Sequence, residues 1–170
     1  AVRLARERID ALLPLTGHTL AIAVWGNQGP TMVHWTEAPQ AVPVALRLGD
    51  VMPLLSSATG RCFAAFMGDE GHDAQRVGPM IRAELARLKK LPRNGPLPLD
   101  LPTSMAEVQE MLDEVRRRGV ARVVHSLQAS VAGFGAPVFD VQGRMVLAMV
   151  VLGSVATLDT DWDGGPATAL

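Results

Sequence analysis

The feature that most constrains this fold is an unbroken apolar run near the C-terminus, Met145 to Leu152. A strand with one face in water alternates apolar and polar residues, whereas this run contains no polar residue. The turn sequence Asp140-Val141-Gln142-Gly143 precedes it. We therefore expect a central strand that is covered on both faces and entered through a hairpin turn.

Other strands are predicted from short apolar stretches bounded by turn residues. The cluster Gly26 to Pro30 separates two of them and indicates a hairpin. The expected strands are Thr19–Trp25, Thr31–Thr36, a third around Pro43–Leu48, Val120–Ser126 and Val131–Phe139.

Helical spacing of apolar residues predicts four helices. The first carries Ala5, Ile9, Leu12 and Leu13, and we expect Pro14 and Gly17 to end it. A short helix follows Ser56–Gly60, with Cys62, Phe63, Phe66 and Met67 as its apolar residues, and the next is expected to start near Pro79.

The fourth helix has the clearest boundaries. Ser104 and Glu107 form a capping-box pattern, in which the hydroxyl and the carboxylate each satisfy a free backbone donor. Arg116–Arg118 fall in the last turn, where positive charge suits the helix dipole, and Gly119 is the expected C-terminal cap. The order of elements predicts an α+β domain with a largely antiparallel sheet and helices packed on it.

Composition narrows the function classes. The 170 residues fit a single domain, 1–170, with 16 basic and 17 acidic side chains and a net charge of −1. Domains that grip nucleic acid alone carry a basic excess, so we expect no DNA binding by this domain itself. No apolar stretch is long enough for a membrane helix, and one cysteine, Cys62, allows no internal disulfide, so a cytoplasmic location is expected. The chain begins within a helical pattern without Met, which suggests a piece of a longer protein.

Three stretches of the sequence, at residues 53–65, 116–121 and 135–144, resemble motifs of a known family of bacterial transcription regulators, the IclR family. Residues 53–65, PLLSSATGRCFAA, are similar to the family's typical PLHATATGKAFLA. Residues 116–121, RRRGVA, and 135–144, GAPVFDVQGR, are similar to its RRRGYA and AAPVFDADGR stretches. The motifs occur in the family's order, and the resemblance runs from about Leu4 to Gly153.

The resemblance implies a GAF-like domain that binds a small effector and mediates self-association into dimers or tetramers. In the family a winged helix-turn-helix domain precedes it and contacts DNA, and none is found in these 170 residues. The helix from Val2 to Leu13 matches the end of the family's interdomain connector, residues 1–14. The alternative is a GAF-like sensory module from another kind of signalling protein.

A candidate ligand site follows in part from chemistry. A helix N-terminus presents unpaired N–H groups, so Ser57-Ala58-Thr59 could hold a ligand carboxylate. Alternatively, Ser57 only caps the helix. The resemblance places the rest of the pocket, and His125 lies close enough in sequence to reach its rim. The positions carried over are Val44, Leu46, Val123, Val131, Gly133, Val150 and Leu152.

This lining departs from relatives that bind small oxo-acids. Val123 stands where those have an acidic residue, Gly133 where they have a thiol, and Val150 and Leu152 where they have serines. Apolar walls favour an aromatic or medium-length aliphatic acid, since burying about 150 Å² at roughly 25 cal/mol per Å² contributes a few kcal/mol. The alternative is that these side chains fill the core and close the pocket.

No catalytic, cofactor or metal site is predicted. Serines lack a nucleophile-elbow pattern, so we expect a non-enzyme. His72 is expected in a solvated loop, and Cys62 as a small core residue. Trp25 and Trp35, on the first two strands, are candidates for contacts between subunits.

Overall fold

The structure is a computed structural model that describes residues 1–39, 46–67, 71–95, 99–126 and 130–170. Within these residues the strands form one antiparallel sheet in the order β2-β1-β5-β4-β3. The strands are β1 (Thr19–Gly26), β2 (Gly29–Thr36), β3 (Ala121–Val124), β4 (Val131–Phe139) and β5 (Met145–Ser154). The predicted α+β class is confirmed.

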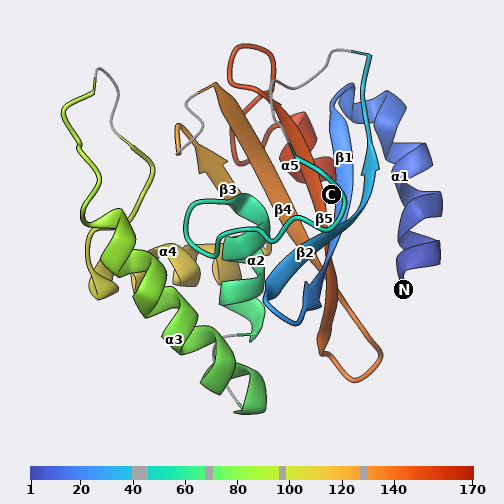
Figure 1. The fold of residues 1–170 in the computed structure, drawn as a ribbon. Helices are drawn as coiled ribbons and strands as arrows, with labels where there is room; N and C mark the ends of the chain where they lie inside the picture. The colour runs from blue at the N-terminus through green and yellow to red at the C-terminus, as the bar shows by residue number, and fades with distance from the viewer. Residues whose placement is uncertain (40–45, 68–70, 96–98, 127–129) are drawn as a thin grey trace.

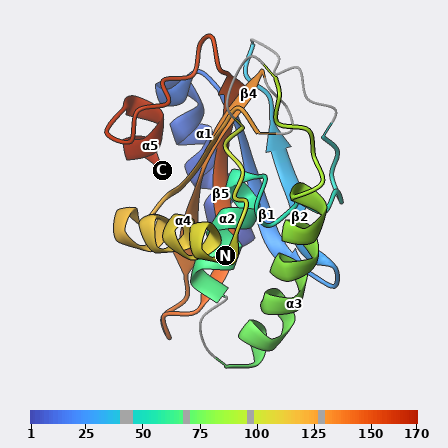
Figure 2. The ribbon, with the colours of Figure 1, turned by 90° about the vertical axis from the view of Figure 1, so that its left-hand side faces the viewer.

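Helices cover both faces of the sheet (Figure 1). One face carries α2 (Ala58–Met67), flanked by α3 (Gly71–Leu88) and α4 (Met105–Arg118). The other carries α1 (Val2–Thr16) and the short α5 (Gly165–Ala169), which touch each other. Figure 2, turned by 90°, shows α2 directly over the sheet with α3 and α4 on either side of it. We call these the α2 face and the α1 face.

The central position of β5 is as predicted. It pairs with β1 on one side and β4 on the other, with Val150 opposite both Ala21 and Gly135. Residues 147–153 are all buried. Alternate side chains enter two separate hydrophobic clusters, Val150 on the α2 face and Val151 on the α1 face. A strand covered on both faces has no use for polar alternation, which explains the unbroken apolar run.

The predicted caps of α4 are largely confirmed. Ser104 is the N-cap, and its Oγ accepts a hydrogen bond from the Glu107 N–H at 3.1 Å. Gly119 ends the helix with φ 72°, a left-handed conformation that glycine adopts without steric cost. The Glu107 carboxylate accepts from the N–H and hydroxyl of Thr103, one residue before the expected donor.

Two predictions of helix boundaries at prolines were wrong, whereas the predicted end of the first helix at Gly17 is confirmed. Pro14 lies inside α1, which ends only at Gly17, and Pro79 lies in the middle of α3, which begins at Gly71. His72 therefore belongs to a helix and not to a loop. A proline removes one hydrogen bond, to the carbonyl four residues before it. Those carbonyls belong to Asp10 and Gln75, both exposed residues, so water can replace the missing donor.

The third predicted strand lies partly outside the described residues, at 43–45. Of its remainder, residues 46–48 are not in a strand. Extended pairing occurs just after it: Val51 bridges Thr31 on β2, and the Met52 N–H donates to the Pro30 carbonyl at 2.7 Å. The short helix α5, with Pro166 near its start, was not predicted because five residues show no helical period.

Candidate functional site

A cavity of about 300 Å³ lies on the α2 face. Its walls come from the start of α2, from the segment before it, and from β3, β4 and β5. The lining residues are Leu46, Asp50, Val51, Met52, Pro53, Ser56, Ser57, Ala58, Thr59, Val123, Ser126, Val131, Ala132, Gly133 and Leu152. The space is at the lower end of the range for small-molecule pockets.

Most of the predicted ligand-binding residues meet at this cavity. Eight of the eleven line it: Leu46, Ser57, Ala58, Thr59, Val123, Val131, Gly133 and Leu152. Val150 is fully buried in the core and does not reach the lining. His125 also lies outside it, although the next residue, Ser126, lines it. Val44 lies outside the described residues.

The cavity stays open although Val123 and Leu152 line it. Gly133 on β4 faces Leu152 on β5, and a Cβ added at Gly133 would lie 2.7 Å from Leu152 Cδ2. The missing side chain at Gly133 therefore makes room for the Leu152 side chain within the wall.

Main-chain contacts fix the start of α2. A Cβ at Gly60 would lie 1.8 Å from the Pro53 carbonyl oxygen, so only glycine allows this approach. Gly135 on β4 is similarly close to the helix, 3.0 Å from its Cβ position to the Ala58 oxygen. These two glycines let α2 begin directly against the preceding segment and the sheet.

Ser57 acts as the helix cap. Its Oγ accepts from the Gly60 N–H at 2.9 Å and donates to the Pro53 carbonyl at 2.7 Å. With both roles in use, Ser57 offers little to a ligand. The alternative interpretation of Ser57 as a cap therefore describes its hydroxyl correctly.

Four other polar groups of the lining lack a hydrogen-bond partner within the described residues. Within the described part of the chain, the N–H groups of Ala58 and Thr59 have no hydrogen-bond partner, as expected for a first helical turn. The hydroxyls of Thr59 and Ser126 have none there either. Sequence reasoning missed Ser126, and it missed Asp50, whose Oδ2 accepts from the Arg47 N–H at 2.8 Å.

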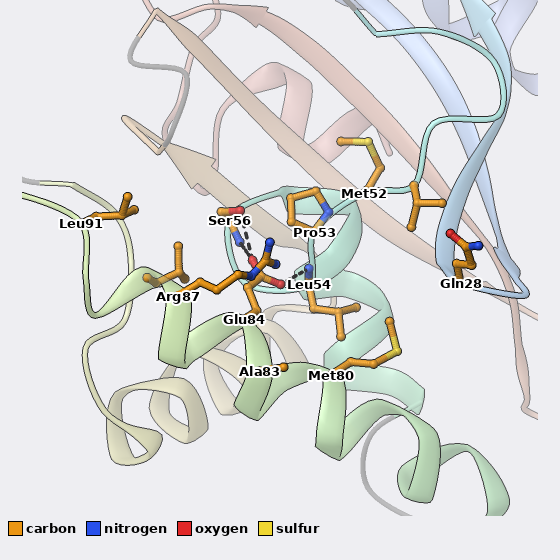
Figure 3. Close-up of a pocket in the computed structure, with 12 residues that line it drawn as sticks. Gln28, Met52, Pro53, Leu54, Ser56, Met80, Ala83, Glu84, Arg87 and Leu91 are labelled. Carbon is orange, nitrogen blue, oxygen red and sulfur yellow. Dashed lines mark hydrogen bonds between the residues drawn. The ribbon is translucent and has the colours of Figure 1, made fainter.

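A buried carboxylate holds the segment that leads into α2. Glu84 of α3 is 5% exposed and accepts from the N–H groups of Leu54, Leu55 and Ser56 at 2.6, 3.1 and 3.2 Å. The Ser56 hydroxyl donates to it as well, at 3.1 Å (Figure 3). Three successive N–H groups around one carboxylate form an anion-binding turn. Here the protein supplies the anion itself.

A buried cation lies on the opposite side of the helix start. Arg61 is 3% exposed, and its guanidinium donates to the Asp100 carboxylate at 3.1 Å and to the Leu55 and Arg122 carbonyls at 2.8 Å. Burial lowers the pKa of Arg61, and the Asp100 carboxylate opposes that effect. Asp100 also accepts from the Val124 N–H at 3.0 Å. The pair therefore ties α2 to β3 beside the cavity.

Cys62 and two of the arginines have structural roles, and the contacts expected of Trp25 and Trp35 with another subunit stay a prediction. Cys62 is fully buried, and burial raises the pKa of its thiol, which confirms it as a core residue. Arg116 donates to the Ala65 carbonyl, and Arg118 pairs with Glu114. Trp25 packs against Phe63, with ring centroids 5.8 Å apart.

The described residues hold neither a metal-binding cluster nor a membrane-spanning helix. In the described ranges, no three His, Cys, Asp or Glu side chains lie close enough together to hold a metal ion. None of the described helices is long and apolar enough to cross a membrane.

Comparison with known proteins assigns this architecture to a family. Residues 2–163 match the family described as bacterial transcriptional regulator IclR C-terminal. The glycerol operon regulatory protein of Streptomyces griseus is 30% identical over 161 residues, which cover 95% of this chain and 57% of that protein. This chain therefore spans little more than half the length of that relative.

Solved structures agree. The structure of HmgR from Pseudomonas aeruginosa superposes with a TM-score of 0.80 at 30% identity, covering 99% of this chain and 61% of the other. The C-terminal domain of KdgR from E. coli shares the fold, with a TM-score of 0.73 at 18% identity, over 99% of this chain and 90% of the other. This is a family of transcription regulators and not of enzymes. The chain belongs to the IclR family, as a C-terminal effector-binding domain with the GAF-like fold.

Proposed function

We propose that this domain senses an aromatic or medium-length aliphatic carboxylic acid, bound in the cavity at the start of α2. The observation that carries the proposal is the division of the lining into an apolar part and a helix end with open donors. Val123, Val131 and Leu152 supply the apolar walls. The N–H groups of Ala58 and Thr59 supply the donors.

The ligand's orientation follows from the charges. A carboxylate is stabilised at a helix N-terminus by the open N–H groups and by the helix dipole. Asp50 is the anionic side chain of the lining, so it disfavours a second negative charge beside it. The carboxylate therefore faces Ala58 and Thr59, and the apolar body lies against β3 and β5.

Within the whole regulator, we propose that this domain also mediates self-association and that DNA is bound by another domain. The net charge of −1 supports the second point, because phosphate contacts require a basic surface. The proposed role of α1 is that of the end of a connector between the two domains. A ligand that binds the two states of the regulator with different affinities would shift their equilibrium.

The test is thermal unfolding of the purified chain against a panel of small molecules. Benzoate, phenylacetate and octanoate represent the proposed class, and glyoxylate and pyruvate represent small oxo-acids. Glycerol is included because the relative from Streptomyces griseus is named for a glycerol operon. An effector at about 100 times its Kd adds about 2.7 kcal/mol and raises Tm by several degrees.

A matched pair of variants ties the effect to the cavity. Val123→Ser puts a hydroxyl into the lining, whereas Val124→Ser changes the next residue, which packs against the α1 face. We expect Val123→Ser to reduce the shift and Val124→Ser to leave it unchanged. A shift with the oxo-acids or glycerol alone would contradict the proposed class, as would no shift with any aromatic or aliphatic acid.

A further inference from the structure

A second, larger hollow lies on the other side of the segment that leads into α2. We call it the α3 groove; its volume is about 660 Å³. Figure 3 shows it between that segment and α3, with Met52 on one side and Met80 on the other. It is lined by Gln28, Val51, Met52, Pro53, Leu54, Ser56, Met80, Ala83, Glu84, Arg87, Leu88 and Leu91.

The groove and the cavity share a wall. Val51, Met52, Pro53 and Ser56 line both. The wall is fixed at one end by β2, through the Met52 N–H to the Pro30 carbonyl, and at the other by Glu84. A single stretch of chain, residues 51–56, thus separates the groove from the cavity. Its main-chain N–H groups donate hydrogen bonds to β2 at one end and to Glu84 at the other.

The groove's lining is mostly apolar and adaptable. Leu54, Leu88 and Leu91 form its aliphatic part. The unbranched side chains of Met52 and Met80 can adjust to ligands of different shape. Such a surface favours an extended alkyl or aryl body over a compact polar molecule.

The two charged side chains of the groove, Glu84 and Arg87, differ in their partners. The Glu84 carboxylate is directed to the backbone at 54–56 and accepts four hydrogen bonds there. Arg87, one turn further along α3, has no hydrogen bond or ion pair with any described residue. The groove therefore offers one available cation beside an apolar surface.

We propose that the α3 groove is a second ligand site, for an amphipathic anion whose apolar chain lies over Met52 and Met80 and whose carboxylate pairs with Arg87. The site stands apart from the effector cavity in every residue except those of the shared wall. Its coupling to the cavity rests on the proposed function: a ligand that restrains the wall changes affinity on its other side, and the effect is reciprocal.

The experiment is calorimetric titration of the purified chain with octanoate and, as its neutral counterpart, 1-octanol. Arg87→Gln removes the cation, and Arg82→Gln is the matched control, an exposed arginine of α3 outside the lining. Ala83→Phe fills the groove from an exposed position. Val123→Phe fills the effector cavity and leaves the groove as the site under test.

In the Val123→Phe background we expect octanoate to bind, with affinity reduced about fivefold by Arg87→Gln, the scale of an exposed ion pair. Arg82→Gln should have no effect, and octanol affinity should not respond to Arg87→Gln. Ala83→Phe should weaken both probes at least tenfold.

Octanoate binding that Ala83→Phe does not alter would overturn the second site. A change of oligomeric state with Ala83→Phe, with unchanged octanoate affinity, would assign the groove to a second copy of the chain and would also overturn it. Benzoate reports on the effector cavity, and octanoate binding in Val123→Phe reports on the groove. If Val123→Phe loses benzoate binding but retains octanoate binding, the two sites are distinct and each proposal can fail without the other.

Discussion

The two faces of the sheet bury different kinds of side chain. The cluster on the α1 face is apolar and includes Ile9, Leu12, Phe134 and Leu147, none more than 1% exposed. The buried polar and charged side chains of the described residues all belong to the α2 face or to the segment above it. They are Thr19, Ser56, Thr59, Arg61, Glu84 and Ser126. Thr19 belongs with them because it pairs with Leu152 and so shares its face.

This difference separates two tasks. Apolar burial stabilises the α1 face and requires no specific partners. On the α2 face the buried Arg61 and Glu84 hydrogen-bond main chain beside the cavity, whereas the hydroxyls of Thr59 and Ser126 have no partner within the described residues. The cavity thus lies where the protein accepts the cost of desolvating polar groups, and the opposite face compensates for it.

The largest expected effect compares one phenylalanine from each face. Phe134→Ala and Phe63→Ala each remove a fully buried ring and should each cost about 4 kcal/mol of unfolding free energy. Phe134→Ala should leave acid binding intact, because its ring lies in the cluster on the α1 face and contacts Trp162. Phe63→Ala should also weaken binding, because it loosens the packing of α2. Denaturant unfolding and ligand titration measure both; equal loss of binding would erase the distinction between the faces.

A smaller effect is expected at the ion pair between the buried Arg61 and the partly exposed Asp100. Asp100→Ala leaves the Arg61 charge buried with fewer partners and should cost about 3 kcal/mol. The matched control is Glu114→Ala, which breaks an exposed pair with Arg118 and should cost below about 1 kcal/mol. The double variant Arg61→Met with Asp100→Ala should recover part of the loss in urea unfolding. If Asp100→Ala and Glu114→Ala lowered the unfolding free energy equally, the burial of Arg61 would make no difference to the strength of its ion pair.

The smallest effect concerns pH and lies on the exposed start of α4. Hydrogen bonds from Thr103 hold the pKa of the Glu107 carboxyl below its ordinary value. A carboxyl with a lowered pKa in the folded state adds stability above the unfolded pKa, about 4.3 for glutamate, and loses it as pH falls through the folded value. Glu107→Gln should therefore lower Tm slightly at pH 7 and not at all near pH 2. A difference that grew at low pH would contradict this account.

The parts of the fold that the sequence predicted rest on local rules. The central strand follows from the apolar run 145–152, and α4 follows from Ser104 and Gly119, because buried strands and helix caps impose residue types at fixed positions. The predictions at Pro14 and Pro79 failed because they depended on tertiary structure and not on a local rule. The cost of a proline inside a helix depends on whether water reaches the freed carbonyl, which is a tertiary property.

Much of the cavity lining was predictable only through the family resemblance. Residues such as Val123 and Leu152 come from strands far apart in sequence, and their apolar side chains look like any core position. The hydrogen bonds from 54–56 to Glu84 and the pair of Arg61 with Asp100 join positions about 30 and 39 residues apart. The single signal for the first is a glutamate on the apolar side of α3, between Ile81, Leu85 and Leu88.

The close approach at Gly60 has a consequence for how such a domain can diversify. The α2 start is fixed by the close approach of main chain to main chain at Gly60 and by the hydrogen bonds of Ser57 and Glu84. Residues such as Val123 and Leu152 contribute only side-chain surface to the cavity. Single substitutions in the cavity lining can therefore change ligand preference without disturbing the main-chain contacts that fix the start of α2. Such a domain can change the ligand that it recognises while its fold and the main-chain contacts at the start of α2 stay the same.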